Sequence, residues 1–136
     1  MRLVDTNVLL YAASLHPAEQ QKTESALNLL RQDDLCLSVQ VLQEFYYQAT
    51  RPSRLIQLNH KQALDFLGKL AGMPVQPLDR GLFLEAVDIC QRFQLSYWDA
   101  AILATARRMN CDAVYSEDLS DQQDYAGLRV INPFSS

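Results

Sequence analysis

The stretch Arg2-Leu3-Val4-Asp5-Thr6-Asn7-Val8-Leu9-Leu10 decides the fold of this chain. An apolar pair, Leu3 and Val4, leads directly into three polar residues, and an apolar-rich segment follows over residues 8–13. This order predicts a short buried strand that ends at Asp5 and a brief helix after it. A buried strand followed at once by a helix is typical of proteins with parallel sheets.

The same alternation continues along the chain. Further strands are predicted at residues 35–38, 75–78, 113–116 and 128–131. Helices are predicted from Pro17 to about Gln32, from the Ser38 cap to Arg51 and Pro52, from Asn59 to before Gly72 and Pro74, after Asp79, and from Ser96 to about Met109. Because parallel strands are joined by right-handed crossovers, this pattern predicts a sheet with helices on both faces.

Length and composition favour one globular domain over residues 1–136. The chain has 136 residues, of which 49% are hydrophobic, which is enough for a layered core. No apolar run reaches the roughly 18 residues that cross a bilayer, so we expect no membrane association and a cytoplasmic location. The three cysteines, Cys36, Cys90 and Cys111, are odd in number and widely spaced, and we expect them to be reduced and buried.

The net charge of −4 argues against a protein that holds nucleic acid by bulk attraction. It does not exclude nucleic acid as a partner. Acidic side chains gathered in one pocket would bind divalent cations, and these would supply the positive charge that a phosphate meets. The positions of the acids therefore matter more than their sum.

Four acids are predicted to converge. Parallel strands end at one edge of a sheet, and helices begin there. Asp5 ends the first strand, Asp118 follows the strand at residues 113–116, and Asp99 lies in the first turn of its helix. Glu44 lies about six residues into its helix, but its long side chain leans back toward the helix N-terminus. All four carboxylates are therefore expected at one crevice.

Each acid also has a purely structural interpretation. Asp99 stands three residues after Ser96, which is the spacing of a capping box. Asp5 could only cap the helix after it, Glu44 could be solvated beside an apolar face, and Asp118 could belong to an ordinary polar loop. Convergence favours the functional interpretation of the set.

Four carboxylates in one pocket repel one another, and a divalent cation relieves that repulsion. Oxygen ligands without nearby histidine or cysteine favour Mg²⁺ or Mn²⁺ over zinc. Two such ions about 4 Å apart would activate a water and stabilise the leaving oxygen of a phosphodiester. The residues thus predict metal-dependent phosphodiester hydrolysis.

Four motifs together closely resemble the PIN domain: Val4-Asp5-Thr6-Asn7-Val8-Leu9, Leu42-Gln43-Glu44-Phe45, Tyr97-Trp98-Asp99-Ala100 and Ser116-Glu117-Asp118-Leu119. The opening Asp-Thr-Asn, the Trp-Asp-Ala helix and the closing Asn132-Pro133-Phe134 are most similar to the VapC-type toxins of bacterial toxin–antitoxin pairs. The resemblance implies an α/β fold, a three-layer α/β/α sandwich around a mainly parallel sheet of about four to five strands.

The resemblance also implies a function. It implies an Mg²⁺- or Mn²⁺-dependent ribonuclease that is usually a homodimer and is held inactive by a cognate antitoxin protein. By position, Asp5, Glu44 and Asp99 would be metal ligands or lie just behind them, and Asp118 would be the fourth acid, with Glu117 as the competing assignment. Asn7 and Ser116 would support the site by hydrogen bonds that fix how the carboxylates point.

An aspartyl-phosphate phosphatase of the haloacid-dehalogenase type would also place an Asp after a strand. The sequence argues against it, because Thr6 and Asn7 follow Asp5 and the second aspartate expected two residues on is absent. Two alternatives remain open. A PIN domain could process RNA without an antitoxin. A non-catalytic domain that binds RNA or protein would make the acids structural.

Overall fold

The computed structural model describes residues 1–120 and 123–135. Within them the strands are β1 (Arg2–Val4), β2 (Leu35–Ser38), β3 (Val75–Gln76), β4 (Ala113–Tyr115), β5 (Asp124–Tyr125) and β6 (Leu128–Ile131). The helices are α1 (Thr6–Ala13), α2 (Gln20–Leu29), α3 (Val39–Thr50), α4 (His60–Gly68), α5 (Arg80–Phe93) and α6 (Tyr97–Arg108), with a 3-10 turn at Pro17–Glu19.

The strands form one sheet in the order β3-β2-β1-β4-β6-β5, and every pairing except β5 with β6 is parallel. The predicted α/β fold with a mainly parallel sheet is confirmed. The described sheet has six strands rather than four to five because β5 was missed. A strand of two residues has no alternation to detect, and it pairs with β6 through a tight turn in which Ala126 and Gly127 both have positive φ.

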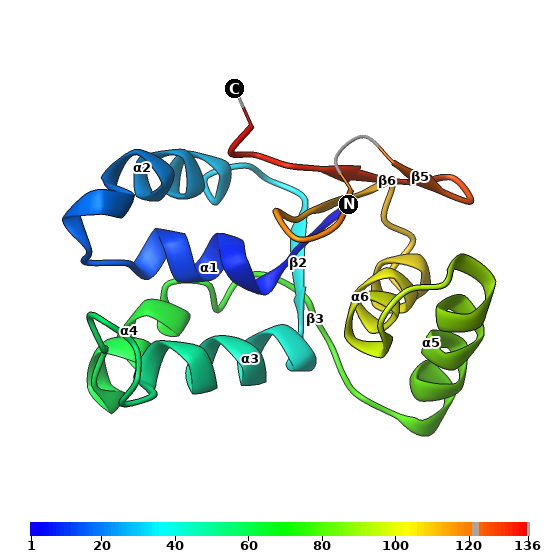
Figure 1. Ribbon diagram of the computed structural model, residues 1–136, viewed down its shortest axis with the longest axis horizontal. Coiled ribbons are helices and arrows are strands. Elements are labelled where there is room, and N and C mark those ends of the chain that lie inside the picture. The colour runs from blue at the N-terminus through cyan, green and yellow to red at the C-terminus, as the bar shows by residue number, and fades with distance from the viewer. Residues whose placement is uncertain (121–122, 136) are drawn as a thin grey trace.

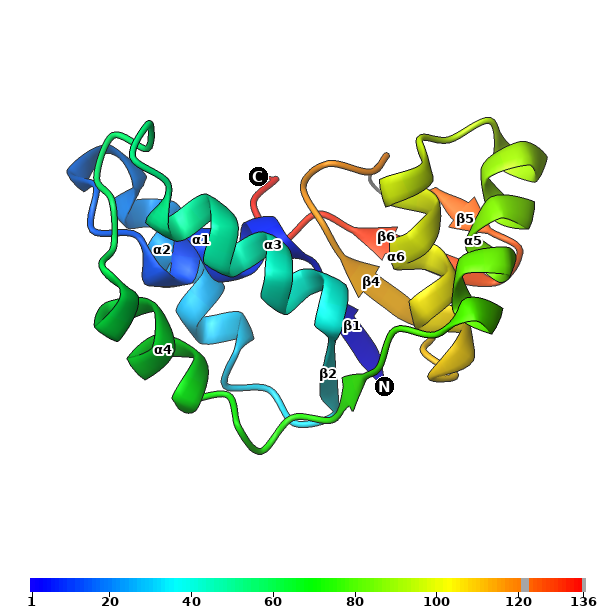
Figure 2. The same ribbon diagram turned by 90° about the horizontal axis from the view of Figure 1, so that it is seen from below.

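The helices cover both faces of the sheet. From β1 the chain steps outward to β2 and β3, and it then returns across the sheet to β4. Right-handed crossovers therefore place α1 to α4 on one face and α5 with α6 on the other, as Figure 1 shows. Figure 2 shows α5 and α6 as a pair beside β4, while α1, α3 and α4 lie on the far side.

The central strands are apolar on both faces because helices cover both. Leu3 and Val4 of β1 and Cys36 of β2 have no exposed surface. On the α3 side, Phe45 is also fully buried, and its ring stacks on that of Phe66 at 5.2 Å between centroids. This ring contact joins α3 to α4 on the same face of the sheet.

Side chains at the predicted caps begin the helices. Ser38, Asn59, Asp79 and Ser96 each accept a backbone N–H of the helix that follows. Other boundaries differ from the prediction. Pro17 opens the 3-10 turn and α2 itself begins at Gln20, while α4 ends at Gly68, before the predicted stop. Strand β3 stops at Gln76 rather than Leu78 because Pro77, which follows, has no N–H to donate.

The cysteines are free, as predicted, but two of them meet. Cys36 is buried, whereas Cys90 and Cys111 are half-buried. The Sγ atoms of Cys36 and Cys111 lie 3.5 Å apart, although the two residues are 75 positions apart in sequence.

No helix in the described part of the chain is both long and apolar enough to span a membrane.

Candidate active site

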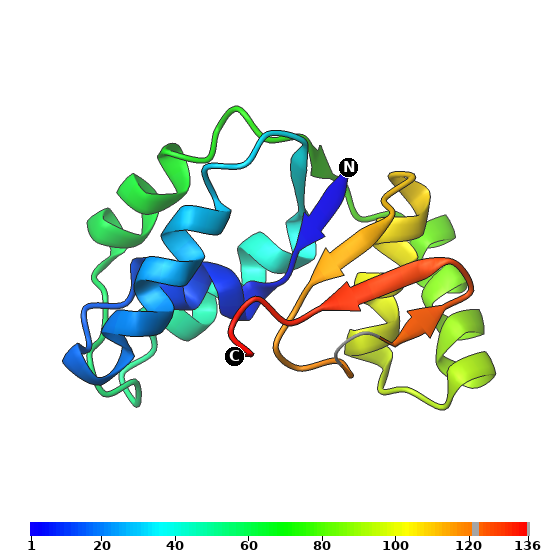
Figure 3. The ribbon, with the colours of Figure 1, turned by 90° about the horizontal axis from the view of Figure 1, so that it is seen from above.

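The strand order changes direction between β1 and β4, and in open parallel sheets ligands bind at the carboxyl ends of the strands flanking such a switch. Figure 3 shows β1 and β4 side by side, ending at the same edge. Asp5 follows β1 and Ser116 follows β4. The backbone N–H of Asp5 donates to the carbonyl of Tyr115 at 3.0 Å, so the two strand ends are tied together.

Asp5 is buried and is the N-cap of α1. Its Oδ1 accepts the N–H of Thr6 at 2.7 Å, so Asp5 does cap the helix, as its structural interpretation predicts. Its Oδ2 accepts a second hydrogen bond, from the Ser116 hydroxyl at 2.8 Å. The two hydrogen bonds therefore fix the orientation of the carboxylate, with Oδ1 at the start of α1 and Oδ2 at the end of β4.

Glu44 lies in the second turn of α3, and its side chain reaches back to the same edge. Its Oε1 accepts hydrogen bonds from the Gln40 amide at 3.1 Å and from the Thr6 hydroxyl at 3.4 Å. Thr6 is the residue next to Asp5, so two acids from different helices share one neighbour. Gln40 stands one turn before Glu44 and holds it toward the crevice.

Asp99 is in the first turn of α6, whose N-terminus lies at this edge. The helix reaches the edge because it leads into β4 and so runs antiparallel to the strands, not because it directly follows a strand. The Ser96 hydroxyl accepts the N–H of Asp99 at 3.2 Å. Gln40 also donates to the carbonyl of Trp98 at 3.4 Å, which ties the start of α6 to α3.

Asp118 and Glu117 follow β4 and face different partners. The Ser116 hydroxyl, which donates to Asp5, accepts the N–H of Asp118 at 3.1 Å. The Glu117 carboxylate instead binds the Lys22 ammonium at 2.6 Å and accepts the Tyr11 hydroxyl at 2.9 Å. Glu117 is therefore compensated by the charge of Lys22, whereas Asp118 forms no ion pair with any residue that the structure describes.

Asn7 links α1 to the same loop. Its Oδ1 accepts the backbone N–H of Glu117 at 3.3 Å. Its Nδ2 is buried and has no hydrogen-bond partner among the described residues. Buried amide donors are normally paired, so this one marks a place where an oxygen-bearing ligand would be accommodated.

Lys22 is the contributor that the sequence did not reveal. It lies on α2, 95 residues from Glu117, and its ammonium also stands 4.7 Å from the centre of the Tyr11 ring. Only its position near the start of a predicted helix was visible in the sequence. Nothing in the spacing connects it to the loop after β4.

The acids perturb one another. Burial raises the pKa of Asp5 from 3.8 to about 6, although the hydrogen bonds from Ser116 and Thr6 oppose that rise, and the charges of Asp118 and Glu44 add to it. Burial also raises the pKa of Glu44, with further contributions from the charges of Asp118 and Asp99. All four predicted acids thus take part in one electrostatic site.

The arrangement is open rather than a closed cage. Within residues 1–120 and 123–135, no three His, Cys, Asp or Glu side chains form a group that could directly hold a metal ion. The carboxylates are joined through hydroxyl and amide groups of Ser116, Thr6 and Gln40.

Comparison with known proteins identifies the family. The family model of the PIN domain matches residues 2–128, which is nearly the whole chain. The chain belongs to the PIN domain family. No curated protein matches its sequence.

Solved structures share the PIN fold at low sequence identity. A toxin–antitoxin complex from Klebsiella pneumoniae aligns with a TM-score of 0.69 and 20% identity over 100% of both chains. VapC20 of Mycobacterium tuberculosis, described as a toxin that cleaves the sarcin-ricin loop, aligns with a TM-score of 0.68 and 18% identity over 87% of this chain and 90% of its own. FitAcB of Neisseria gonorrhoeae aligns with a TM-score of 0.62 and 19% identity over 98% of this chain and 99% of its own.

The residues of this PIN domain fit a divalent cation. Carboxylate oxygens are the ligands that Mg²⁺ prefers, and Mg²⁺ is usually bound by one or two carboxylates while it keeps several waters. The pKa of Asp5 is raised mainly by burial, and the negative charges of Asp118 and Glu44 raise it further. A cation would supply compensating positive charge, and the unpaired Nδ2 of Asn7 would suit an oxygen of its ligand.

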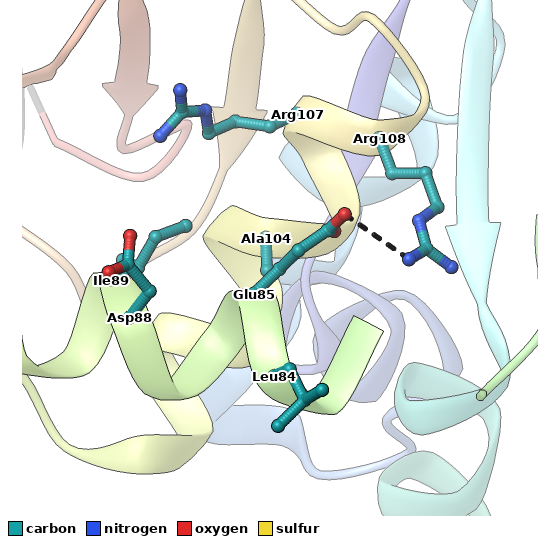
Figure 4. Close-up of a pocket in the computed structure, with 7 residues that line it drawn as sticks. All are labelled: Leu84, Glu85, Asp88, Ile89, Ala104, Arg107 and Arg108. Atoms are coloured by element: carbon teal, nitrogen blue, oxygen red, sulfur yellow. Dashed lines mark ion pairs between the residues drawn. The ribbon is translucent and has the colours of Figure 1, made fainter. Parts of the chain in front are cut away.

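A separate hollow of about 520 Å³ lies between α5 and α6 (Figure 4). It is lined by Leu84, Glu85, Asp88, Ile89, Ala104, Arg107 and Arg108. Arg108 binds Asp79 at 2.6 Å and Glu85 at 3.3 Å, so this arginine is already compensated. None of the four predicted acids lines the hollow, and it is no part of the crevice at the strand ends.

Proposed function

We propose that this PIN domain is a ribonuclease dependent on Mg²⁺ or Mn²⁺, and that it is the toxin of a type II toxin–antitoxin pair. The observation that carries the proposal is the convergence of Asp5, Glu44, Asp99 and Asp118 at the switch point of the sheet, with the pKa of Asp5 raised to about 6. Such a site needs added positive charge, and a phosphodiester needs the same charge to be attacked.

Asp5, Glu44, Asp99 and Asp118 would hold the cations. When bound, Mg²⁺ or Mn²⁺ lowers the pKa of a coordinated water and neutralises the charge that develops on the phosphate. Asp5 contributes a carboxylate whose direction is fixed by its bonds to Thr6 and Ser116. Glu44 contributes a carboxylate that accepts hydrogen bonds from Gln40 of the same helix and from Thr6 of α1.

Ser116, Asn7 and Glu117 would position the loop after β4 rather than contact the phosphate. Ser116 couples Asp5 to the backbone of Asp118. Glu117 is held at two points. Asn7 accepts its backbone N–H, and Lys22 binds its carboxylate. In this assignment Asp118 is the fourth acid, and Glu117 is excluded because Lys22 already neutralises it.

The proposed partners are an RNA substrate, a cognate antitoxin and a second copy of the chain. The similar toxin–antitoxin complex from Klebsiella pneumoniae supports the antitoxin only as an analogy, because it is 20% identical to this chain. An adjacent reading frame whose product protects cells from this protein would support the toxin assignment. Harmless expression of this chain alone would favour an RNA-processing PIN nuclease without an antitoxin.

Cleavage assays test the catalytic part directly. The purified protein should cut RNA in Mg²⁺ or Mn²⁺ and stop when the metal is chelated, because carboxylates alone offer no electrophile. Asp5→Asn should fold yet lose cleavage, since asparagine caps a helix well but lacks the charge. Full activity in chelator would reject metal dependence. RNA binding without cleavage in every metal would indicate a non-catalytic binding domain.

A further inference from the structure

A neutral aromatic pocket adjoins the acidic crevice. It has a volume of about 510 Å³ and lies between α3 and the α5–α6 pair, a size within the range of about 300–1,000 Å³ typical of small-molecule sites. Its lining includes Gln40, Gln43, Leu78, Phe83, Tyr97 and Trp98. Trp98 is 64% exposed and Phe83 is 51% exposed, so two ring systems are open to a ligand.

The pocket and the crevice share a wall. Gln40, which lines the pocket, donates to the Glu44 carboxylate at 3.1 Å and to the carbonyl of Trp98 at 3.4 Å. Trp98 is followed directly by Asp99. A molecule bound in the pocket would therefore contact Gln40 and Trp98, which are direct neighbours of Glu44 and Asp99.

The charge of the pocket differs sharply from that of the crevice. Asp79 is the only charged side chain in its lining, and Arg108 neutralises it through an ion pair of 2.6 Å. The pocket thus suits a neutral, flat group with polar edges, while the adjoining crevice, with cations, suits a phosphate. A nucleotide combines these two parts in one molecule.

We propose that this pocket binds one unpaired base of the RNA, next to the phosphate that is cleaved. Trp98 and Phe83 provide the stacking surfaces, and Gln43, which also lines the pocket, supplies an amide for a hydrogen bond to the edge of the base. Tyr97 packs edge-on against Trp98 at 5.1 Å between centroids and thereby steadies its ring. Stacking of bases on aromatic side chains is a general mode of binding single-stranded RNA. The inference rests on the proposed ribonuclease function, since it takes RNA as the ligand.

Fluorescence gives a direct test because Trp98 is the only tryptophan of the chain. A short single-stranded RNA is titrated against the Asp5→Asn variant in Mg²⁺. This variant is expected to lose cleavage, so the RNA should stay intact during the titration. We expect saturable quenching of Trp98 that a duplex of the same sequence does not produce. Phe83→Ala should weaken binding about five- to a hundredfold. Tyr47→Ala, which removes an aromatic ring that is also 64% exposed but lies outside the pocket, should leave the quenching unchanged.

Two results would overturn the subsite. The first is RNA binding, measured by anisotropy of an end-labelled strand, that leaves Trp98 fluorescence unchanged. The second is a fluorescence change that follows protein concentration instead of RNA, together with a dimer in sedimentation that Trp98→Ala abolishes. That outcome would assign the pocket to a second copy of the chain.

The subsite and the proposed function fail in different ways. Quenching by single-stranded RNA without cleavage by the parent protein in any metal would reject the ribonuclease and keep the subsite. Metal-dependent cleavage by the parent with no effect of Trp98→Ala or Phe83→Ala on KM would reject the subsite and keep the ribonuclease. Both substitutions are at exposed positions, so neither should prevent folding.

Discussion

Replacing Asp5 with Asn should stabilise the metal-free protein at neutral pH. Asp5 is only 6% exposed, and its pKa is raised from 3.8 to about 6, mainly by burial. Ionisation of this carboxyl therefore costs the folded state about 3 kcal/mol relative to the unfolded chain. Asparagine removes that cost at nearly unchanged volume, while it still accepts the N–H of Thr6 as a cap.

The gain is partly offset by one hydrogen bond. Asp5 accepts from Thr6 with one oxygen and from Ser116 with the other, and asparagine has only one oxygen to offer. Losing the bond from Ser116 costs about 1 kcal/mol. The net gain is then about 2 kcal/mol above pH 7, or about 7 °C in Tm for a domain of this size.

The pH dependence of the difference is the sharper test. Because the folded pKa of Asp5 is raised, the folded parent binds this proton more tightly than the unfolded parent, so its stability falls as pH rises from about 4 to about 6. Melting curves in chelator should therefore show the variant above the parent at pH 7.5 and no longer above it at pH 4. Asp88→Asn, which removes an exposed charge outside the crevice, should show no such crossover.

Metal should reverse the order. A cation that binds only the folded state stabilises it by RT ln(1 + [L]/Kd), and the parent, with all four acids, should gain more than the variant. Equal metal-induced shifts would mean that Asp5 does not bind the cation. A variant that melts below the parent at pH 7.5 in chelator would refute the burial argument itself.

Three further predictions follow from single contacts. Asp118→Asn should reduce metal-dependent cleavage more than Glu117→Gln when the two are assayed side by side, because Lys22 already compensates Glu117; the opposite order would exchange their roles. Ser38→Ala should lower stability by about 1 kcal/mol in thermal melts, since its buried hydroxyl caps α3, and an unchanged Tm would show that this cap is dispensable. Diamide, a mild thiol oxidant, should link Cys36 to Cys111 and leave a third thiol free for alkylation, because their Sγ atoms are 3.5 Å apart; a mass spectrum with three alkylated thiols would contradict this.

Much of the fold was predictable because local signals agree with the tertiary structure. Caps at Ser38, Asn59, Asp79 and Ser96 each lie where a polar side chain precedes an apolar helical pattern. What escaped prediction was too short or depended on tertiary contacts. Strand β5 has two residues, and its turn owes its shape to positive φ at Ala126, a residue type with no preference for that conformation.

The placement of the four acids was predicted from topology, but their differences were not. Parallel strands end at one edge of the sheet, and that rule brings Asp5 and Asp118 together without any knowledge of side chains. Asp99 reaches the same edge for a different reason, because α6 leads into β4 and so begins there. Whether each acid is buried, bonded or paired depends on residues distant in sequence. Ser116 is 111 positions from Asp5, and Lys22 is 95 positions from Glu117. No local pattern encodes such pairs.

The same burial that makes Asp5 costly to ionise also bears on the cation binding proposed for this site. An exposed carboxylate is solvated by water and gains little from a metal, whereas the ionised Asp5 is only 6% exposed and has Glu44 and Asp118 as negative neighbours. Its hydrogen bonds from Thr6 and Ser116 come from neutral groups, which orient the carboxylate without cancelling its charge. Glu117, by contrast, is one residue from Asp118 and is cancelled by Lys22. Lys22 thus neutralises Glu117, whereas no ion pair with Asp5 or Asp118 occurs among the described residues. This is the electrostatic pattern that the proposed metal-dependent nuclease would require.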